Sequence, residues 1–453
     1  MRRKILFLVL VLSVCLISLS FQSQRDDSHK RTISGSDVRE VHFSQTGRAF
    51  GQHERLQFAS DQVLVKFKSD ISAMEIEAII SAYRTYKIKK ISGLNIYQLQ
   101  IPQGFSVEET VYAYSKNPDV EFVEPNYVAR ITETPNDSLF SYQYALNNTG
   151  QAIGIPGSPT GRARADIKAT AAWDETIGLE ATVIAIVDTG VEILHPDLQD
   201  KIISGGRDFV NSDFDADDDN GHGTHVAGIA AADTHNTEGI AGVAWDCRIL
   251  PVKVMDADGS GLYSWIIDGI RWAADNEVHV INLSLGGDAD ADSLRAAITY
   301  AVSKGIVCVA SGGNDGSSVL YPAAYDNCLA VAATDYNDDR PDWSNSGPEI
   351  DVAAPGERVL STIPTWFFGE GSLPYAFGFG TSMSAPHVAG LAALIKSMKP
   401  WLSAQEIMNI IRYTADDVNS SGNPGKDEFI GYGRINMEKA LVPIKISAAS
   451  ENE

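Results

Sequence analysis

Apolar and polar positions follow two different patterns along the chain. In residues 59–131, short stretches alternate between strand-like and helix-like spacing of the apolar residues. In residues 135–442, the strand-like stretches are continuously apolar, and helical stretches separate them. Strands that are apolar on both faces need cover on both faces, whereas alternating strands need it on one. We therefore expect two domains with different architectures.

The first block predicts a small α+β domain. Ser106 and Glu109, three positions apart, have the spacing of a capping box that begins a helix. The predicted order is strand, helix, strand, strand, helix, strand, which is the split βαβ or ferredoxin-like arrangement. The strands are expected at residues 62–67, 88–91, 95–101 and 120–128, and the helices at residues 71–83 and 107–115.

The second block predicts an α/β domain, with a mainly parallel sheet sandwiched by helices. A linker is expected at residues 21–58, which are polar and without periodicity, and a tail at residues 443–453. The expected strands are Val183–Val187, Ile249–Val254, Val278–Leu285, Ile306–Ala310 and Leu329–Thr334. The expected helices are His222–Ala232, Ser264–Asn276, Asp292–Lys304, Ser384–Met398 and Ala404–Thr414.

The amino terminus has the pattern of a secretory signal peptide over residues 1–20. A basic head precedes the apolar run Ile5–Leu19, which is shorter than the roughly 20 residues of a membrane span. Two alternatives stay open: an uncleaved anchor, and lipoprotein processing at Cys15, although Val14 stands where a small residue is expected. The pattern predicts a secreted, extracytoplasmic protein without a membrane span once the signal is removed.

Composition excludes some partners. The 453 residues include 59 Asp and Glu against 36 Lys and Arg, for a formal net charge of −23. Such a chain repels a phosphate backbone, so we expect no nucleic-acid partner. Four cysteines are too few for a disulfide scaffold. Cys247, Cys308 and Cys328 would remain after signal removal, and because three is odd, at least one stays unpaired or pairs with another chain. Cys308 and Cys328 lie in apolar runs, where we expect buried free thiols, with a disulfide as the alternative.

Three separated motifs carry candidate chemistry. Asp188 ends an apolar strand and precedes Thr189-Gly190, and the carboxyl ends of strands carry the sites of open α/β sheets. His222 stands between glycines where a helix begins, and the helix dipole there disfavours the charged imidazole. Ser382 follows Gly380-Thr381 and begins a helix of small residues. Taken singly, each residue could have only a turn, packing or capping role.

Together, the three motifs predict nucleophilic catalysis. A serine needs a base within reach and a third group that orients the base, and the order Asp188, His222, Ser382 is one of the known chain orders for that set. Asn314 follows a predicted strand and offers an amide that stabilises an oxyanion, together with the Ser382 backbone N–H.

Two alternatives concern neighbouring residues. Ser384 is a rival nucleophile, but deeper in a helix its hydroxyl tends to bond back to the chain. His222 and His225 have a spacing compatible with a metal site, although no HExxH glutamate and no thiolate lie near them. We therefore favour Ser382 as the nucleophile and a packing role for His225.

The sequence resembles the subtilisin-like serine proteases, or subtilases, over residues 135–442. Residues 59–131, which close in Glu124-Pro125-Asn126-Tyr127, resemble the inhibitory propeptide of the same family. The resemblance rests on the following motifs of the larger block: Asp188-Thr189-Gly190, Asn220-Gly221-His222-Gly223-Thr224-His225-Val226-Ala227-Gly228, Gly313-Asn314 and Gly380-Thr381-Ser382-Met383-Ser384-Ala385-Pro386-His387-Val388-Ala389-Gly390.

The resemblance implies a subtilisin-like fold and a serine endopeptidase that acts on polypeptides. Its own propeptide would be an intramolecular inhibitor, removed by a cut around Arg130–Thr134. Ser284, Leu285 and Gly286 match the segment whose backbone pairs with an extended substrate. Leu320 departs from the small residue that the family often has before Tyr-Pro, which puts a preference for large aromatic side chains in doubt.

Two other classes of function fit the sequence less well. A catalytically silent subtilase-like protein would bind peptides without turnover, yet all four chemical positions are occupied by the required residue types. A serine esterase or lipase would have a Gly-x-Ser-x-Gly elbow and the chain order Ser, Asp, His, and Ser382 fits neither.

Calcium is the cofactor that the acidic residues suggest. Residues 208–219 hold six Asp and one Asn in twelve positions, and clustered oxygens of this kind suit Ca²⁺ unless the segment is simply a solvated loop. Resemblance to a calcium loop of some thermostable subtilases suggests the ligands Asp208, Asp213 and Asp217. A second structural calcium site is implied by resemblance alone, with the ligands Asp137, Asp197 and Asn236.

Overall fold

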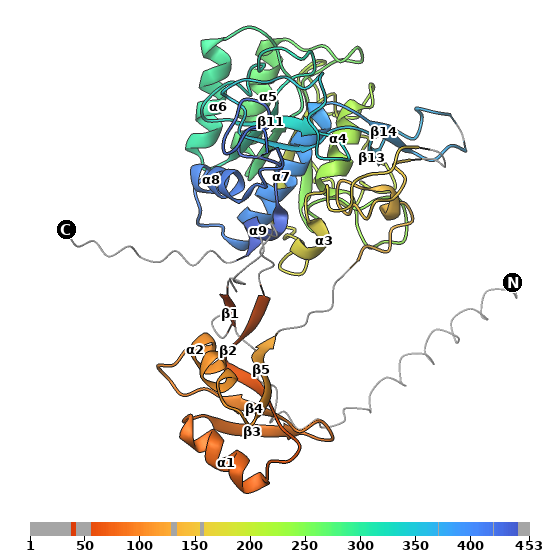
Figure 1. Cartoon of the computed structure of the whole chain (residues 1–453). Coiled ribbons are helices and arrows are strands. Elements are labelled where there is room, and N and C mark those ends of the chain that lie inside the picture. Colours follow the sequence, from red (N-terminus) through yellow and green to blue (C-terminus); the bar gives the residue numbers. More distant parts are fainter. Residues whose placement is uncertain are drawn as a thin grey trace, which may run out of the picture. The chain divides into compact units, whose positions relative to one another are not determined.

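The computed structural model describes residues 38–41, 56–127, 134–154, 158–369, 371–419 and 421–442. The predicted signal peptide, Cys15, the tail and most of the predicted cut region at residues 130–134 lie outside these ranges. The chain divides into two compact units, Met1–Arg130 and Ile131–Glu453 (Figure 1).

The first unit is an antiparallel sheet with two helices. Its sheet is built around β2, which pairs with β1, β4 and β5, while β3 pairs with β4. Because β2 alternates, Val63, Val65 and Phe67 point into the core of this unit. Its elements are β1 Val38–Val41, β2 Leu56–Phe67, α1 Ala73–Ala82, β3 Tyr86–Ile91, β4 Ile96–Gln100, α2 Val107–Ser115 and β5 Val120–Tyr127.

From β2 onward, the order of elements agrees with the predicted split βαβ arrangement. The Ser106–Glu109 capping box forms as predicted, and Ser72 and Glu75 form a second one at α1. The predicted linker at residues 21–58 differs from the structure, because Val38–Val41 forms a strand and β2 begins at Leu56. The strand β1 has only four residues, which is too short to show a period, and it is recognised by its antiparallel pairing with β2.

The second unit contains a seven-stranded sheet in which all neighbouring strands are parallel. The strand order is β12-β11-β10-β9-β6-β8-β7. The strands are β6 Val183–Asp188, β7 Arg207–Asp208, β8 Arg248–Lys253, β9 Val280–Leu283, β10 Val307–Ser311, β11 Leu329–Thr334 and β12 Val352–Pro355. A separate antiparallel pair consists of β13 Val359–Thr362 and β14 Tyr375–Gly378.

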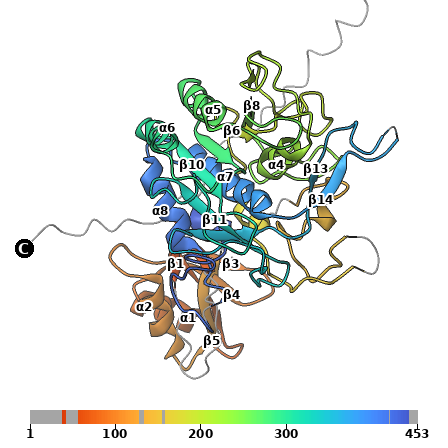
Figure 2. The same ribbon diagram turned by 90° about the horizontal axis from the view of Figure 1, so that it is seen from above.

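Helices cover both faces of the parallel sheet, as its apolar strands predict. Ile184 and Ile186 face a core shared with α4 and α7, whereas Ala185 and Val187 face a core shared with α5 and α6. Figure 2 shows α5 and α6 on one side of the strands and α4 and α7 on the other. The helices are α3 Ala169–Ala172, α4 His222–Ala231, α5 Tyr263–Asp275, α6 Asp292–Ser303, α7 Thr381–Met398, α8 Ala404–Thr414 and α9 Met437–Leu441, with a 3-10 turn at Phe140–Tyr142.

One further prediction concerns the state of the cysteines. Cys247, Cys308 and Cys328 are free and buried, as expected for Cys308 and Cys328 from their apolar runs. Burial raises the pKa of Cys308 to about 12, so this thiol stays protonated at neutral pH.

In the described part of the chain, no helix is both long and apolar enough to cross a membrane.

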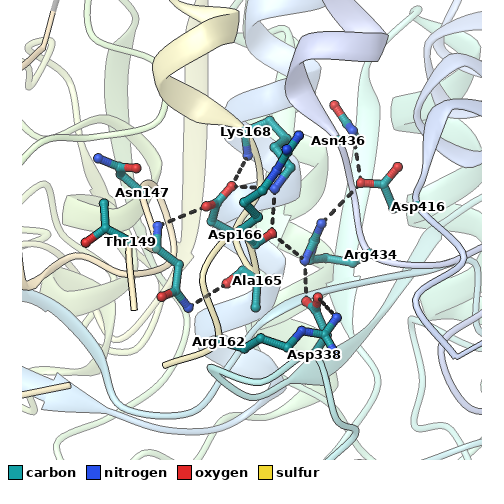
Figure 3. Close-up of polar contacts among 12 residues, drawn as sticks. Asn147, Thr149, Arg162, Ala165, Asp166, Lys168, Asp338, Asp416, Arg434 and Asn436 are labelled. Carbon is teal, nitrogen blue, oxygen red and sulfur yellow. Dashed lines mark hydrogen bonds and ion pairs between the residues drawn. The ribbon is translucent and has the colours of Figure 1, made fainter. Parts of the chain in front are cut away.

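A buried ion network joins the carboxyl-terminal segment to the edge of the sheet (Figure 3). The side chain of Arg434 is only 3% exposed and forms ion pairs with Asp338 and Asp416. Lys439 also pairs with Asp416, at 2.6 Å. The Ile435 backbone N–H donates to the carbonyl of Ala353 in β12, so this segment covers an otherwise open sheet edge.

Replacing Arg434 with Gln should destabilise the second unit by about 3–5 kcal/mol, because two largely buried carboxylates lose a charged partner. Urea unfolding followed by tryptophan fluorescence measures the change. The control is Arg271→Gln, which removes an exposed i,i+4 ion pair with Asp275 and should leave the unfolding midpoint close to that of wild type. Equal midpoints for both variants would contradict a structural role for the network.

Candidate active site

Asp188 and His222 meet at the carboxyl end of β6. Asp188 is 1% exposed, and its Oδ1 lies 2.6 Å from Nδ1 of His222. The Thr189 backbone N–H donates to the same oxygen at 2.8 Å. Because the carboxylate accepts at Nδ1, the imidazole proton lies there and Nε2 is left as the acceptor. This is the geometry of a base that a carboxylate orients.

The environment of His222 favours proton uptake. Burial lowers the pKa of the imidazole, but the charge of Asp188, its hydrogen bond and the charge of Asp218 outweigh burial and raise it overall. In contrast, burial lowers the pKa of His225 to about 4, and its Nε2 lies 3.1 Å from the Ala376 carbonyl. The two histidines therefore differ in role, and His225 packs against the β13–β14 pair.

Asp218 anchors the start of α4, and sequence reasoning missed its role. Its buried carboxylate accepts hydrogen bonds from the backbone N–H groups of Asn220, Gly221 and Thr224 and from the Thr224 hydroxyl. It also accepts from the Thr189 hydroxyl at 2.8 Å. In the sequence, this residue stands out only as one of the acidic residues in 208–219. Its position four residues before the first residue of the helix, His222, was the available signal.

Two glycines allow the loop after β6 to lie against the start of α4 and against Ala216. A Cβ added to Gly223 would lie 2.0 Å from the Gly190 carbonyl oxygen. Gly190 itself has a φ of +107°, and a Cβ there would lie 2.6 Å from the Ala216 carbonyl oxygen. Side chains at these positions would push the segments apart. Both glycines of the sequence motifs are therefore required for close approach.

Lys253 fastens a third segment to the same rim of the sheet. It ends β8, is 1% exposed and donates through Nζ to the carbonyl oxygens of Thr189 (2.7 Å) and Met255 (3.1 Å). Its ammonium group also forms an ion pair with Asp219. The loop after β8 is thus tied to the loop that follows Asp188.

Ser382 lies in the first turn of α7, and its hydroxyl donates to the Ser284 carbonyl at 3.1 Å. The Ser284 hydroxyl donates back to the Ser382 carbonyl at 2.8 Å. Ser384 is fully buried, and its hydroxyl donates to the Ala354 carbonyl. The hydroxyl therefore bonds to strand β12 and not, as expected, back along its own helix, and its burial leaves Ser382 as the accessible hydroxyl.

Asn314 is placed beside the start of α7. Its Oδ1 accepts from the Thr381 backbone N–H at 2.8 Å and lies 2.9 Å from the Thr381 hydroxyl. These contacts fix the amide plane and leave Nδ2 without a partner among the described residues. The predicted oxyanion donor, Asn314, is therefore held by Thr381, the residue that immediately precedes the predicted nucleophile Ser382.

Ser284, Leu285 and Gly286 follow β9 at the same edge of the sheet. Gly287 and Tyr321 exchange two backbone hydrogen bonds of 2.9 Å, which sets the segment against Leu320. A Cβ on Gly286 would lie 2.9 Å from the Leu320 Cβ. Leu320 therefore narrows the space beside the predicted substrate-binding segment.

In the acidic loop, two of the three predicted ligands accept hydrogen bonds in local turns, and the third accepts one from a distant segment. Asp208 accepts from the backbone N–H groups of Val210 and Asn211, and Asp213 accepts from that of Asp215. Asp217 accepts from the Ile193 backbone N–H at 2.9 Å. Within the described ranges, no group of three or more His, Cys, Asp or Glu side chains is arranged to hold a metal ion.

The second predicted set of ligands does come together. Asp137 accepts from the Asn236 backbone N–H at 3.4 Å, and Asp197 accepts from the Asn236 side-chain amide at 2.9 Å. Both carboxylates are buried, and neither forms an ion pair in the part of the chain that the structure describes. Burial, with the nearby charge of Asp137, raises the pKa of Asp197 to about 7. Uncompensated negative charge of this kind suits a hard cation.

Comparison with known proteins identifies the family. Residues 180–433 match the sequence profile of the Subtilase family, and residues 44–126 match the Fervidolysin N-terminal prodomain. The Thermophilic serine proteinase of Bacillus sp. (strain AK1) is 40% identical over 395 residues, which covers 86% of this chain and 89% of that protein. Thermitase of Thermoactinomyces vulgaris is 46% identical over 276 residues, covering 61% of this chain and 93% of thermitase.

A solved structure agrees with these sequence matches. A protease from Pseudoalteromonas arctica has a TM-score of 0.59 and 34% identity, covering 68% of this chain and 99% of that one. The chain belongs to the subtilase family and is a subtilisin-like serine endopeptidase with an N-terminal prodomain. The predicted family, fold class and enzyme class are confirmed.

Asp218→Asn should destabilise the protein by roughly 2–3 kcal/mol and lower kcat for peptide hydrolysis, because an amide cannot accept from all the donors that the carboxylate satisfies. The shift of α4 would misplace His222. Urea unfolding and steady-state kinetics measure the two effects. Asp215→Asn, at an exposed carboxylate in the same loop, should change both by little. Wild-type kcat in the Asp218 variant would contradict the anchoring role.

Proposed function

We propose that the chain is made as an inhibited precursor, is secreted, and cleaves internal peptide bonds through Asp188, His222 and Ser382. The 2.6 Å contact between Asp188 and His222 is the observation that carries the proposal, because it orients the imidazole and leaves Nε2 as the proton acceptor. The apolar leader at residues 1–20 supports export.

In the proposed reaction, the Ser382 hydroxyl turns from the Ser284 carbonyl toward His222 and attacks the peptide carbonyl carbon. Nε2 of His222 takes the hydroxyl proton, and the Asp188 carboxylate stabilises the resulting imidazolium. The tetrahedral oxyanion accepts hydrogen bonds from Nδ2 of Asn314 and the Ser382 backbone N–H.

The intermediate then collapses to an acyl-enzyme. The C–N bond breaks, and His222 gives its proton to the leaving amine. Water, deprotonated by His222, next attacks the ester carbon, and the Ser382 oxygen leaves with the proton. Ser284, Leu285 and Gly286 hold the substrate backbone as an added strand. Leu320 restricts the side chain that enters the adjacent pocket.

The prodomain is proposed to inhibit its own catalytic domain before removal. We assign residues 59–131 to the inhibitor, residues 135–442 to the catalytic domain, residues 21–58 to a linker containing the β1 strand, and residues 443–453 to a tail. The match of residues 44–126 to a protease prodomain supports an inhibitor in this part of the chain, although it begins within the proposed linker. No observation favours the catalytically silent alternative.

Ser382→Ala should lower peptide hydrolysis by roughly 10⁴-fold or more and leave the precursor uncut. The matched control is Ser384→Ala, which removes the buried rival hydroxyl and should keep hydrolysis within about threefold of wild type, because no reacting atom contacts Ser384. Chromogenic peptide assays and mass spectrometry of the purified protein measure both. Hydrolysis that survives Ser382→Ala and is lost in Ser384→Ala would reverse the assignment.

We also propose that Ca²⁺ stabilises surface loops of the catalytic domain. The residues that would hold it are Asp137, Asp197 and Asn236, because buried carboxylates without a cationic partner meet there. The acidic loop with Asp208, Asp213 and Asp217 is proposed as a second site on its resemblance and donor chemistry. When bound, the ion neutralises carboxylates and does not take part in peptide hydrolysis.

Removing Ca²⁺ with chelator should lower the melting temperature of the Ser382→Ala protein, since a ligand at a hundred times its Kd contributes about 2.7 kcal/mol. Asp197→Asn should reduce the difference in melting temperature between the calcium-loaded and the chelated protein. Asp326→Asn, at an exposed site, should leave this difference unchanged. Scanning calorimetry at fixed pH gives the values. Identical melting temperatures with calcium and with chelator would remove the calcium proposal.

A further inference from the structure

Three adjacent aromatic side chains stand exposed on the connection between β13 and β14. This connection is described at residues 363–369 and 371–374. Trp366, Phe367 and Phe368, named here the aromatic cluster, are 50%, 47% and 58% exposed. Their rings contact one another, with centroids 5.8 Å apart for Trp366 and Phe367 and 5.3 Å apart for Phe367 and Phe368. A contiguous apolar patch in water usually marks a binding surface.

The base of this connection is fixed to the catalytic domain. The Thr365 backbone N–H donates to Oε2 of the buried Glu192 at 2.9 Å, and the Thr365 hydroxyl bonds the other carboxylate oxygen. The Phe367 N–H closes a turn on the Pro364 carbonyl at 2.9 Å. The aromatic cluster is therefore presented from an anchored turn, which lowers the entropy cost of binding to it.

The aromatic cluster adjoins the catalytic histidine. A Cβ added to Gly221 would lie 3.0 Å from Cε2 of Phe367, so this ring lies against the Gly221 backbone. Gly221 immediately precedes His222. Phe367 of the aromatic cluster thus contacts the residue that immediately precedes α4 and His222.

The proton transfer from His222 to the leaving amine defines which part of a substrate lies beside the aromatic cluster. The acyl side of the scissile bond is held by Asn314 and by the strand segment after β9. The leaving amine takes its proton from His222, so the chain that departs with the new amino terminus extends from the scissile bond on the histidine side. The aromatic cluster lies beside His222, and the substrate-binding segment at Ser284 lies beside Ser382.

We propose that the aromatic cluster binds large apolar side chains, aromatic ones above all, in the substrate segment on the leaving-group side of the cut. This inference rests on the proposed function. Stacked or edge-on rings at a desolvated surface provide the strongest contacts of this kind. The aromatic cluster thereby selects polypeptides by the residues on the leaving-group side of the scissile bond, in addition to any selection by the pocket near Leu320.

Two quenched fluorescent peptides test the proposal on the enzyme obtained from the full chain. They share the sequence up to the cut and carry either Phe or Ser at the second and third positions after it, with the cut site checked by mass spectrometry. Rates are divided by the active-site concentration from fluorophosphonate labelling. In wild type, kcat/KM for the Phe peptide should exceed that for the Ser peptide by about fivefold or more.

Trp366→Ser and Phe368→Ser should each bring this ratio toward one. The matched control is Trp401→Ser: Trp401 is 75% exposed and lies past the far end of α7, about 24 Å of helix from Ser382. This control should keep the wild-type ratio. A ratio near one in wild type, or an unchanged ratio in both loop variants, overturns the inference.

The same experiment separates two other outcomes. If wild type is not labelled by the fluorophosphonate and cleaves neither peptide, the proposed function fails and the inference falls with it. If the loop variants keep the peptide ratio but lose binding to vesicles of phosphatidylcholine and phosphatidylglycerol, the aromatic cluster is a lipid-binding surface and the inference is wrong.

Discussion

The buried carboxylate of Asp218 is the constraint on which the catalytic rim depends, the rim being the sheet edge where Asp188 and His222 meet. It accepts hydrogen bonds from the loop after β6 and from the first turn of α4, so it fixes the two segments that carry Asp188 and His222. Without this fixed spacing, the 2.6 Å contact between carboxylate and imidazole would have to be made by flexible loops. The carboxylate therefore converts two chain segments 34 residues apart into one rigid unit.

The rest of the rim is assembled on the same principle. Parallel strands end at one edge of the sheet, and buried polar groups then tie the loops that extend from them. Lys253 joins the loops after β6 and β8, and the reciprocal hydrogen bonds of Ser284 and Ser382 join β9 to α7. Each of these contacts is a hydrogen bond in a site largely shielded from water. Such bonds are strong there, and losing one lowers the stability of the fold.

Sequence patterns predicted most of the fold because a strand that is buried on both faces is a continuous run of apolar residues, which is easily recognised in the sequence. The runs of β6, β8, β10 and β11 are almost entirely apolar, and the expected bounds differ from the observed ones by one residue or none. The strand β12 was missed because Val352–Pro355 is short and alanine-rich, and β7 because two residues carry no periodicity. The β13–β14 pair was missed because its pairing across twelve intervening residues depends on tertiary contacts.

The candidate site was predictable where the chemistry needs particular residue types next to glycines. Asp188, His222, Asn314 and Ser382 stand in such motifs; Asp188 contacts His222, and Asn314 contacts Thr381, the residue before Ser382. The anchoring role of Asp218 was hidden in a run of acidic residues, since sequence alone does not show which carboxylate is buried. The grouping of Asp137 with Asp197 also depends on long-range folding that no local pattern encodes.

The buried thiols have a consequence for how the enzyme withstands its surroundings. Cys247, Cys308 and Cys328 are unpaired, and burial raises the pKa of each, which keeps the reactive thiolate scarce. The described catalytic domain therefore draws no stability from cross-links that a reductant would break. It should tolerate the change from a reducing to an oxidising compartment without altering its covalent structure.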